Sequence, residues 1–151
     1  MKSFLFLLLA VFFAFLTQAQ QAKPLVGANI ILIKTGETGE NAFKKWEKHL
    51  EQNGYKIDRS YIDVLTLSTV PKASGNNKFV YLIHTAVTPT GDMAIKLQWQ
   101  ATDNMFTGTK EVDYNNWEHT TTKASPNQVI YQNFLKTAQA FGNYPIEYKK
   151  E

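Results

Sequence analysis

Apolar residues recur at helical spacing in two segments of the chain, 40–53 and 126–141. The first ends in Asn-Gly, a typical helix stop, and shows one narrow apolar stripe. The second follows Ser125 and Pro126, which suit the cap and the first position of a helix. The residues expected to face the core are Phe43, Trp46, Leu50, Ile130, Tyr131, Phe134, Leu135, Ala138 and Phe141. We predict one helix in each segment.

Other segments alternate with a period of two, or are apolar throughout, as strands do. The predicted strands are 28–34, 55–70, 78–88 and 93–101, with one or two short strands in 102–124. A phase shift near Val64 and Leu65 indicates a bulge or bend in the second of them. Turn residues at 73–77 and 89–92 separate the later strands. We expect the last residues, 143–151, to form a tail.

This order of elements predicts a single α+β domain that spans residues 20–151. Two helices would cover one face of an antiparallel sheet of about five strands, in the order β-α-β-β-β-β-α. The alternative is a helix-grip fold, in which a longer, curved sheet wraps the last helix around an apolar cavity. A cavity of that kind would favour a lipid or another small ligand.

The predicted order resembles half of a TATA-box-binding-protein-like (TBP-like) fold. It is also similar to an uncharacterised family of small secreted bacterial proteins with that fold. The resemblance covers about residues 25–142 and rests on five features. They are the apolar N-terminal run, the first helix with Trp46, the strand pairs around Gly75 and Gly91, and the final helix capped by Ser125. It implies a two-layer α+β fold and brings no catalytic residues with it.

The first residues have the pattern of a secretory signal peptide. A positive start at Lys2 is followed by an apolar run over 4–16, and Thr17 and Ala19 place small residues before a cleavage site. The run is shorter than the ~20 residues that a membrane-spanning helix needs, which favours cleavage over an uncleaved anchor. We predict that 1–19 is removed, and that the mature protein is periplasmic or extracellular with no membrane span.

Composition argues against several classes of function. The chain has no cysteine, so disulfides, thiolate metal sites and thiol catalysis are excluded. Its formal net charge at pH 7 is only +3, and Arg59 is its only arginine. Nucleic-acid readers rely on arginine forks, so neither this composition nor an exported location favours a nucleic-acid partner.

No motif in the chain points to a cofactor, a metal or a catalytic residue. The segment TGETGE, 35–40, lies between a strand and a helix but lacks the Gly-Lys pair of a phosphate-binding loop. The histidines at 49, 84 and 119 lack the close spacing of a zinc site, and no serine lies in Gly-x-Ser-x-Gly. We therefore predict a non-catalytic protein. The alternative is a hydrolase with dispersed carboxylates, drawn from Asp58, Asp63, Asp103, Glu111 and Asp113.

Aromatic residues gather in 112–119. The run Tyr114-Asn115-Asn116-Trp117 fits a tight hairpin, since asparagine tolerates the backbone angles that such turns need. On that interpretation these residues are scaffold. The alternative is a ligand-binding surface, because Trp and Tyr combine apolar area with a polar group. The candidate residues for that surface are Trp99, Tyr114, Trp117 and His119.

The expected position of any contact surface follows from the strand 93–101. Its apolar residues form one face, which the two helices can cover, and the other face presents Lys96, Gln98 and Gln100. A polar sheet face beside aromatic residues suits an interface rim or a polar ligand more than a lipid pocket. If the domain binds a partner, we expect a protein or a small polar ligand, bound through the sheet and the residues around 99–119. The alternative is that this polar face is a plain solvated surface.

Overall fold

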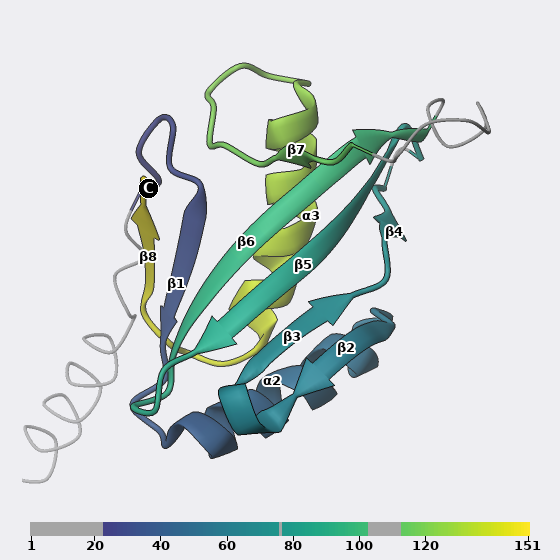
Figure 1. The fold of residues 1–151 in the computed structure, drawn as a ribbon. Helices are drawn as coiled ribbons and strands as arrows, with labels where there is room; N and C mark the ends of the chain where they lie inside the picture. The colour runs from purple at the N-terminus through teal and green to yellow at the C-terminus, as the bar shows by residue number, and fades with distance from the viewer. Residues whose placement is uncertain (1–22, 76, 103–112) are drawn as a thin grey trace, which may run out of the picture.

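The computed structural model describes residues 23–75, 77–102 and 113–151 of the chain (Figure 1). Within them it shows an α+β domain in which one antiparallel sheet of eight strands packs against two α-helices. The predicted α+β class, the antiparallel sheet and the two helices are confirmed. The predicted signal peptide, 1–19, and part of the segment 102–124 lie outside the described residues.

The strands are β1 Ile30–Lys34, β2 Ile57–Tyr61, β3 Thr66–Thr69, β4 Lys72–Ala73, β5 Phe79–Val87, β6 Asp92–Ala101, β7 Asn115–Asn116 and β8 Ile146–Lys149. The helices are α2 Gly39–Gln52 and α3 Pro126–Ala140, and η1 Ile62–Val64 is a 3-10 turn. The sheet order is β2-β3-β5-β6-β1-β8, while β4 pairs with β5 and β7 pairs with β6. Every paired strand is antiparallel to its neighbour.

Both helices cover the same face of the sheet: in Figure 1, α3 lies behind β5 and β6, and α2 lies behind β2 and β3. Trp46 of α2 is fully buried and its ring meets Phe134 of α3 edge-on, with the ring centres 6.3 Å apart. In β6 the alternating residues Met93, Ile95 and Leu97 point into this layer and are buried. The apolar strand face, which repeats every two residues, and the apolar helix faces, which repeat every 3.6 residues, therefore pack into one core. We call the sheet face turned away from α2 and α3 the open face.

The caps of the two helices follow from local sequence. The Ser125 hydroxyl accepts a hydrogen bond of 3.2 Å from the Gln128 backbone N–H, and Pro126 takes the first position of α3, as predicted. Residues 35–38 of the segment TGETGE form a loop, and its last two residues, Gly39 and Glu40, begin α2, so the segment is a loop followed by a helix N-terminus. None of the described helices has the length and apolarity needed to cross a membrane.

The prediction of about five strands was wrong, and one cause is the segment 55–70. It is not one bent strand but a hairpin, β2 and β3, reversed by η1 and by Leu65 at a left-handed φ of 52°. Three of its four residues, Ile62, Val64 and Leu65, are apolar, and Asp63 is the only common turn residue in it. In the sequence the reversal therefore shows only as the phase shift near Val64 and Leu65, which a bulge within one strand would also produce.

The C-terminal segment is a strand rather than the expected tail. Ile33 of β1 pairs with Ile146 of β8, which is buried. The Tyr148 and Tyr131 hydroxyls are hydrogen-bonded at 2.7 Å, so the strand is also joined to α3. Only four residues alternate, and their partner strand is at the other end of the sequence. Local pattern carries little information about such a pairing.

The run Tyr114-Asn115-Asn116-Trp117 is not the expected hairpin turn. Asn115 and Asn116 form β7 and pair with Trp99 and Gln98 of β6, and neither has a positive φ. The Trp117 N–H donates to the Leu97 carbonyl at 2.9 Å, which continues this pairing. Asparagine can enter a short strand here because its side chain finds a partner: the Gln98 amide donates to Asn116 Oδ1 at 3.0 Å.

Candidate functional site

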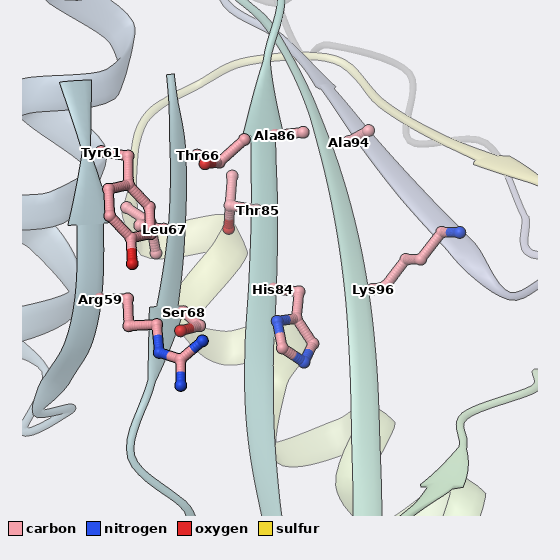
Figure 2. Close-up of a pocket in the computed structure, with 10 residues that line it drawn as sticks. All are labelled: Arg59, Tyr61, Thr66, Leu67, Ser68, His84, Thr85, Ala86, Ala94 and Lys96. Atoms are coloured by element: carbon pink, nitrogen blue, oxygen red, sulfur yellow. The ribbon is translucent and has the colours of Figure 1, made fainter. Parts of the chain in front are cut away.

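A hollow of about 380 Å³ lies on the open face, where β2, β3, β5 and β6 run side by side (Figure 2). This volume lies in the lower part of the range of ~300–1,000 Å³ that is usual for small-molecule sites. Its lining residues are Arg59, Tyr61, Thr66, Leu67, Ser68, His84, Thr85, Ala86, Ala94 and Lys96. None of these is a carboxylate, so the charged side chains that reach the hollow from the described residues are cationic.

Strand register places four of the polar lining residues in one line across the sheet. Arg59 is opposite Ser68, Ser68 is opposite His84, and His84 is opposite Lys96. We call this line the basic row. Because directly opposite side chains in neighbouring strands have Cβ atoms about 5 Å apart, groups at adjacent positions can bind the same small molecule.

A second line of side chains runs beside the basic row. Tyr61, Thr66, Ala86 and Ala94 are opposite one another in the same four strands. We call this line the small row. It lies two residues along each strand from the basic row, a step of about 7 Å. The two alanines have only a methyl group on this face, and the Tyr61 ring lies at the β2 side of the hollow (Figure 2).

Arg59 carries a positive charge into the hollow with little compensation. Its Nε atom is 3.6 Å from Asp58 Oδ2, a distance too long for a good hydrogen bond. The two side chains are 69% and 54% exposed, so water screens their attraction. In Figure 2 the Arg59 guanidinium reaches over β3 toward the His84 ring. The guanidinium amino groups have no partner among the described residues.

His84 is held from one side only. The Gln98 amide nitrogen donates to Asn116 Oδ1, so the Gln98 oxygen accepts from His84 Nε2–H at 3.0 Å. This assignment leaves Nδ1 of His84 without a partner in the described part of the chain. The Ser68 hydroxyl, next in the basic row, has no partner there either. Two polar groups on neighbouring strands are therefore available to a ligand.

Lys96 contributes less charge than its position suggests. Its ammonium group donates to both carboxylate oxygens of Glu151, at 2.8 and 2.7 Å. Figure 2 shows its side chain directed away from Arg59 and His84. The carboxylate of Glu151 therefore offsets this cation, and the lysine borders the hollow mainly with its aliphatic stem.

The four residues that the sequence singled out as a binding surface lie elsewhere. Trp117 is buried and stacks on Tyr131 with ring centres 5.6 Å apart, and its indole N–H donates to the Asn127 carbonyl at 2.9 Å. His119 is 8% exposed and meets the same tyrosine edge-on. Burial lowers the pKa of His119. These two residues are brought together around Tyr131.

Trp99 and Tyr114 are separate from that pair. Trp99 is half-buried and packs edge-on against Phe79, with ring centres 5.5 Å apart. Tyr114 is half-buried, and burial raises its pKa. Among the described residues neither ring contacts Trp117 or His119, and none of the four lines the hollow.

Sequence reasoning missed most of the residues around the hollow. Lys96 was expected on the polar sheet face, and the lone arginine served only as an argument against nucleic-acid binding. A usable signal was the alternation of small or polar residues in β3 and β5: Thr66, Ser68, His84 and Ala86. The hairpin between β2 and β3 hid it, because a single strand over 55–70 would not place Arg59 opposite Ser68.

Other chemistry-bearing groups do not converge within the described residues. No group of three or more His, Asp or Glu side chains there could hold a metal ion. Of the carboxylates considered for a hydrolase, Asp58, Asp63 and Asp113 are exposed, while Asp103 and Glu111 lie outside the described residues. The sequence matches no known protein-family model and no curated protein sequence.

Proposed function

We propose that this protein is a non-catalytic, exported module that binds a small polar ligand in the hollow on the open face of its sheet. One observation carries the proposal. The terminal amino groups of Arg59, the hydroxyl of Ser68 and Nδ1 of His84 belong to residues that line the hollow, and none of these groups has a protein partner in the described part of the chain. A concave site with a few convergent polar groups is the usual form of a small-molecule site.

The arrangement of Ser68 and His84 favours binding over catalysis. A serine nucleophile needs a histidine within about 3.2 Å and a third group that orients the histidine. The two residues are opposite each other, but no hydrogen bond joins them, and Nε2 of His84 is engaged by Gln98 instead. No carboxylate lines the hollow among the described residues. The hydrolase alternative has no such support.

A polar ligand fits the hollow better than the lipid of the helix-grip alternative. A lipid site of that kind would lie between the sheet and the last helix, where Trp46, Phe134 and Ile130 are fully buried against their neighbours. The hollow is on the opposite face and carries the basic row. A TBP-like fold stays our prediction for the finer fold. Two helices on one face of an antiparallel sheet support it, and β8 is an addition to the expected order.

Export rests on the predicted signal peptide. A domain without cysteine must be stabilised by its core, and the layer between sheet and helices provides one. N-terminal sequencing of material released by the producing cell should begin at Gln20. A start at Met1, or protein confined to the cytosol, contradicts export without bearing on the hollow.

Filling the hollow tests the binding site. Ala86→Trp places a large ring on the floor of the hollow, on the face opposite the core. Gln132→Trp adds the same ring at an exposed position of α3 and is the matched control. In a two-dimensional NMR screen with a chemically mixed fragment set, we expect shifts in the amide signals of Ser68, His84 and Ala94. Those shifts should disappear in Ala86→Trp and persist in Gln132→Trp.

Two outcomes contradict the proposed function. One is a screen in which no fragment moves the signals of the open face. The other is binding that survives Ala86→Trp unchanged while the variant remains folded.

A further inference from the structure

We infer that the hollow binds a small organic anion with one carboxylate on a flat apolar body. This inference rests on the proposed function and specifies the chemistry of its ligand. The basic row and the small row are adjacent lines about 7 Å apart, so a small molecule can contact the basic row with one end and the small row with the other. Charge, hydrogen-bonding groups and shape each narrow the class of that molecule.

Arg59 selects for a carboxylate. Of the 16 basic residues in the chain it is the only arginine. Its ion pair with Asp58 is long and exposed, so in the basic row its charge is less compensated than that of Lys96. A guanidinium is a planar fork that binds a planar carboxylate through two parallel hydrogen bonds, whereas a lysine acts as a point charge. Asp58 approaches Nε, so both terminal amino groups remain available for such a pair.

Ser68 is placed to complete the recognition of that carboxylate. It is directly opposite Arg59 on one side and His84 on the other. Its hydroxyl can donate to a carboxylate oxygen held by the guanidinium, since opposite positions are about 5 Å apart at Cβ. The ring of His84 lies on the far side of Ser68, with Nδ1 available to a polar substituent of the ligand.

The charge of the hollow favours a ligand with a single negative charge. Glu151 offsets Lys96 through two close hydrogen bonds, which leaves Arg59 as the main uncompensated cation. Asp58 lies within 3.6 Å of that cation and would repel excess negative charge. A phosphate dianion would need more cations than the hollow supplies. A monocarboxylate matches it.

The small row favours a flat apolar body. Ala86 and Ala94 are opposite each other on β5 and β6 and form a low, apolar shelf. Tyr61 is 55% exposed at the β2 side of this shelf, and its ring can pack against an aromatic or other flat group. Thr66 lies between Tyr61 and Ala86 and adds a methyl group to the same surface.

The lone arginine makes a direct test possible. In protein labelled with ¹⁵N-arginine, the side-chain Nε–H gives one signal, which belongs to Arg59. We expect benzoate to shift this signal saturably. Benzamide has the same ring and shape without the charge, and acetate has the charge without the ring. We expect benzamide, acetate and inorganic phosphate each to bind at least about tenfold more weakly than benzoate, because each lacks a feature that the hollow recognises.

Three variants separate charge from fold, with binding followed at the backbone amides of His84 and Ala94. Arg59→Gln should weaken benzoate binding at least about tenfold. Arg59→Lys should recover only part of that loss, because the fork is missing. Asp58→Asn should strengthen binding, since it removes the repelling carboxylate. Lys136→Gln, which removes an exposed cation on α3, is the matched control and should change nothing.

The outcomes that overturn the inference differ from those that overturn the proposed function. If benzamide and benzoate bind equally well, the hollow does not recognise the negative charge and is a site for neutral ligands. If phosphate binds as tightly as benzoate, the hollow does not select for a carboxylate or for a flat apolar body. If none of the four probes binds while the fragment set still moves the open-face signals, the ligand class is wrong and the site stands. Silence in both screens contradicts the site itself.

Discussion

The indole N–H of Trp46 donates a hydrogen bond of 3.0 Å to the hydroxyl of Thr85, inside the apolar layer between helices and sheet. Trp46 is in the middle of α2, and Thr85 is on β5 between His84 and Ala86. Successive residues of a strand point to opposite faces. The contact that fixes α2 on the core side therefore lies directly beneath the floor of the hollow.

Thr85→Val should destabilise the protein by about 1–3 kcal/mol, because it keeps the shape of the side chain but leaves the buried Trp46 N–H unpaired. Thr85→Ser keeps the hydroxyl and should cost less, about the value of one buried methyl group, ~1 kcal/mol. The measurement is urea unfolding of the two variants and the parent. A valine variant as stable as the serine variant would show that the hydrogen bond is unimportant.

Trp117→Ala should lower the free energy of unfolding by about 3–5 kcal/mol, since it empties a buried site beside Tyr131 and frees the Asn127 carbonyl. Tyr114→Ala removes a half-buried ring and should cost about 1 kcal/mol. Fragment binding in the hollow, per folded molecule, should be unchanged in both. Loss of binding with stability retained would restore the aromatic surface that the sequence suggested.

Ile146→Ala should cost about 2–5 kcal/mol, because Ile146 is buried where β8 pairs with β1. Glu147→Ala changes the next residue, which is exposed on the opposite side of the same strand, and should stay within about 0.5 kcal/mol. Chemical unfolding curves of the two variants compare them directly. Equal, small effects would mean that the C-terminal segment behaves as the tail first expected.

Two glycines in the left-handed region separate backbone strain from crowding. Gly36 has φ +67° with open space where an added methyl group would lie, so Gly36→Ala should cost about 1–2 kcal/mol from backbone strain alone. Gly91 has φ +82°, and an added Cβ would lie 2.6 Å from Thr35 Oγ1 and closer still to the Glu37 carbonyl. Gly91→Ala should therefore lower the free energy of unfolding by more than about 3 kcal/mol, measured by thermal or chemical unfolding. Similar costs at the two sites would contradict the tight approach of the 35–37 loop.

Stability should fall as the pH drops below about 6.5, the ordinary pKa of histidine, with His119 as one source. Burial lowers the pKa of His119 in the folded state, so below pH 6.5 the unfolded chain binds a proton at this position that the folded chain does not. By linkage, stability from this group is then lost on acidification and is unaffected above neutral pH. His119→Phe keeps an aromatic ring against Tyr131 but does not titrate.

The check is the difference in unfolding free energy between His119→Phe and the parent, measured from pH 7.5 to 5. The free energy of unfolding of the variant should rise relative to that of the parent as the pH falls. The difference isolates His119, because the histidines at 49 and 84 are present in both proteins. A difference that does not change with pH would remove His119 as a source.

Elements with a long, regular pattern were predictable from the chain alone. The helix stripe of Phe43, Trp46 and Leu50, and the alternation of Met93, Ile95 and Leu97, both report burial on one face, and both helices and β6 lie close to the expected positions. Short elements were not predictable. The turn at Leu65 has no Gly, Pro or Asn and only Asp63 as a common turn residue, and β8 depends on a partner at the opposite end of the sequence.

The candidate site shows the same division more sharply. The sequence by itself determined that the chain has one arginine, no cysteine and a polar face on the strand 93–101. These properties depend on composition and local periodicity, which a linear chain displays directly. That Arg59, Ser68 and His84 stand in one row was decided only by the antiparallel register of β2, β3 and β5. Register sets which side chains face each other across strands, and it depends on where the chain turns and on which face the core claims. The same dependence placed Trp117 and His119 in the core, because Tyr131, which packs against both, comes from a different element, α3.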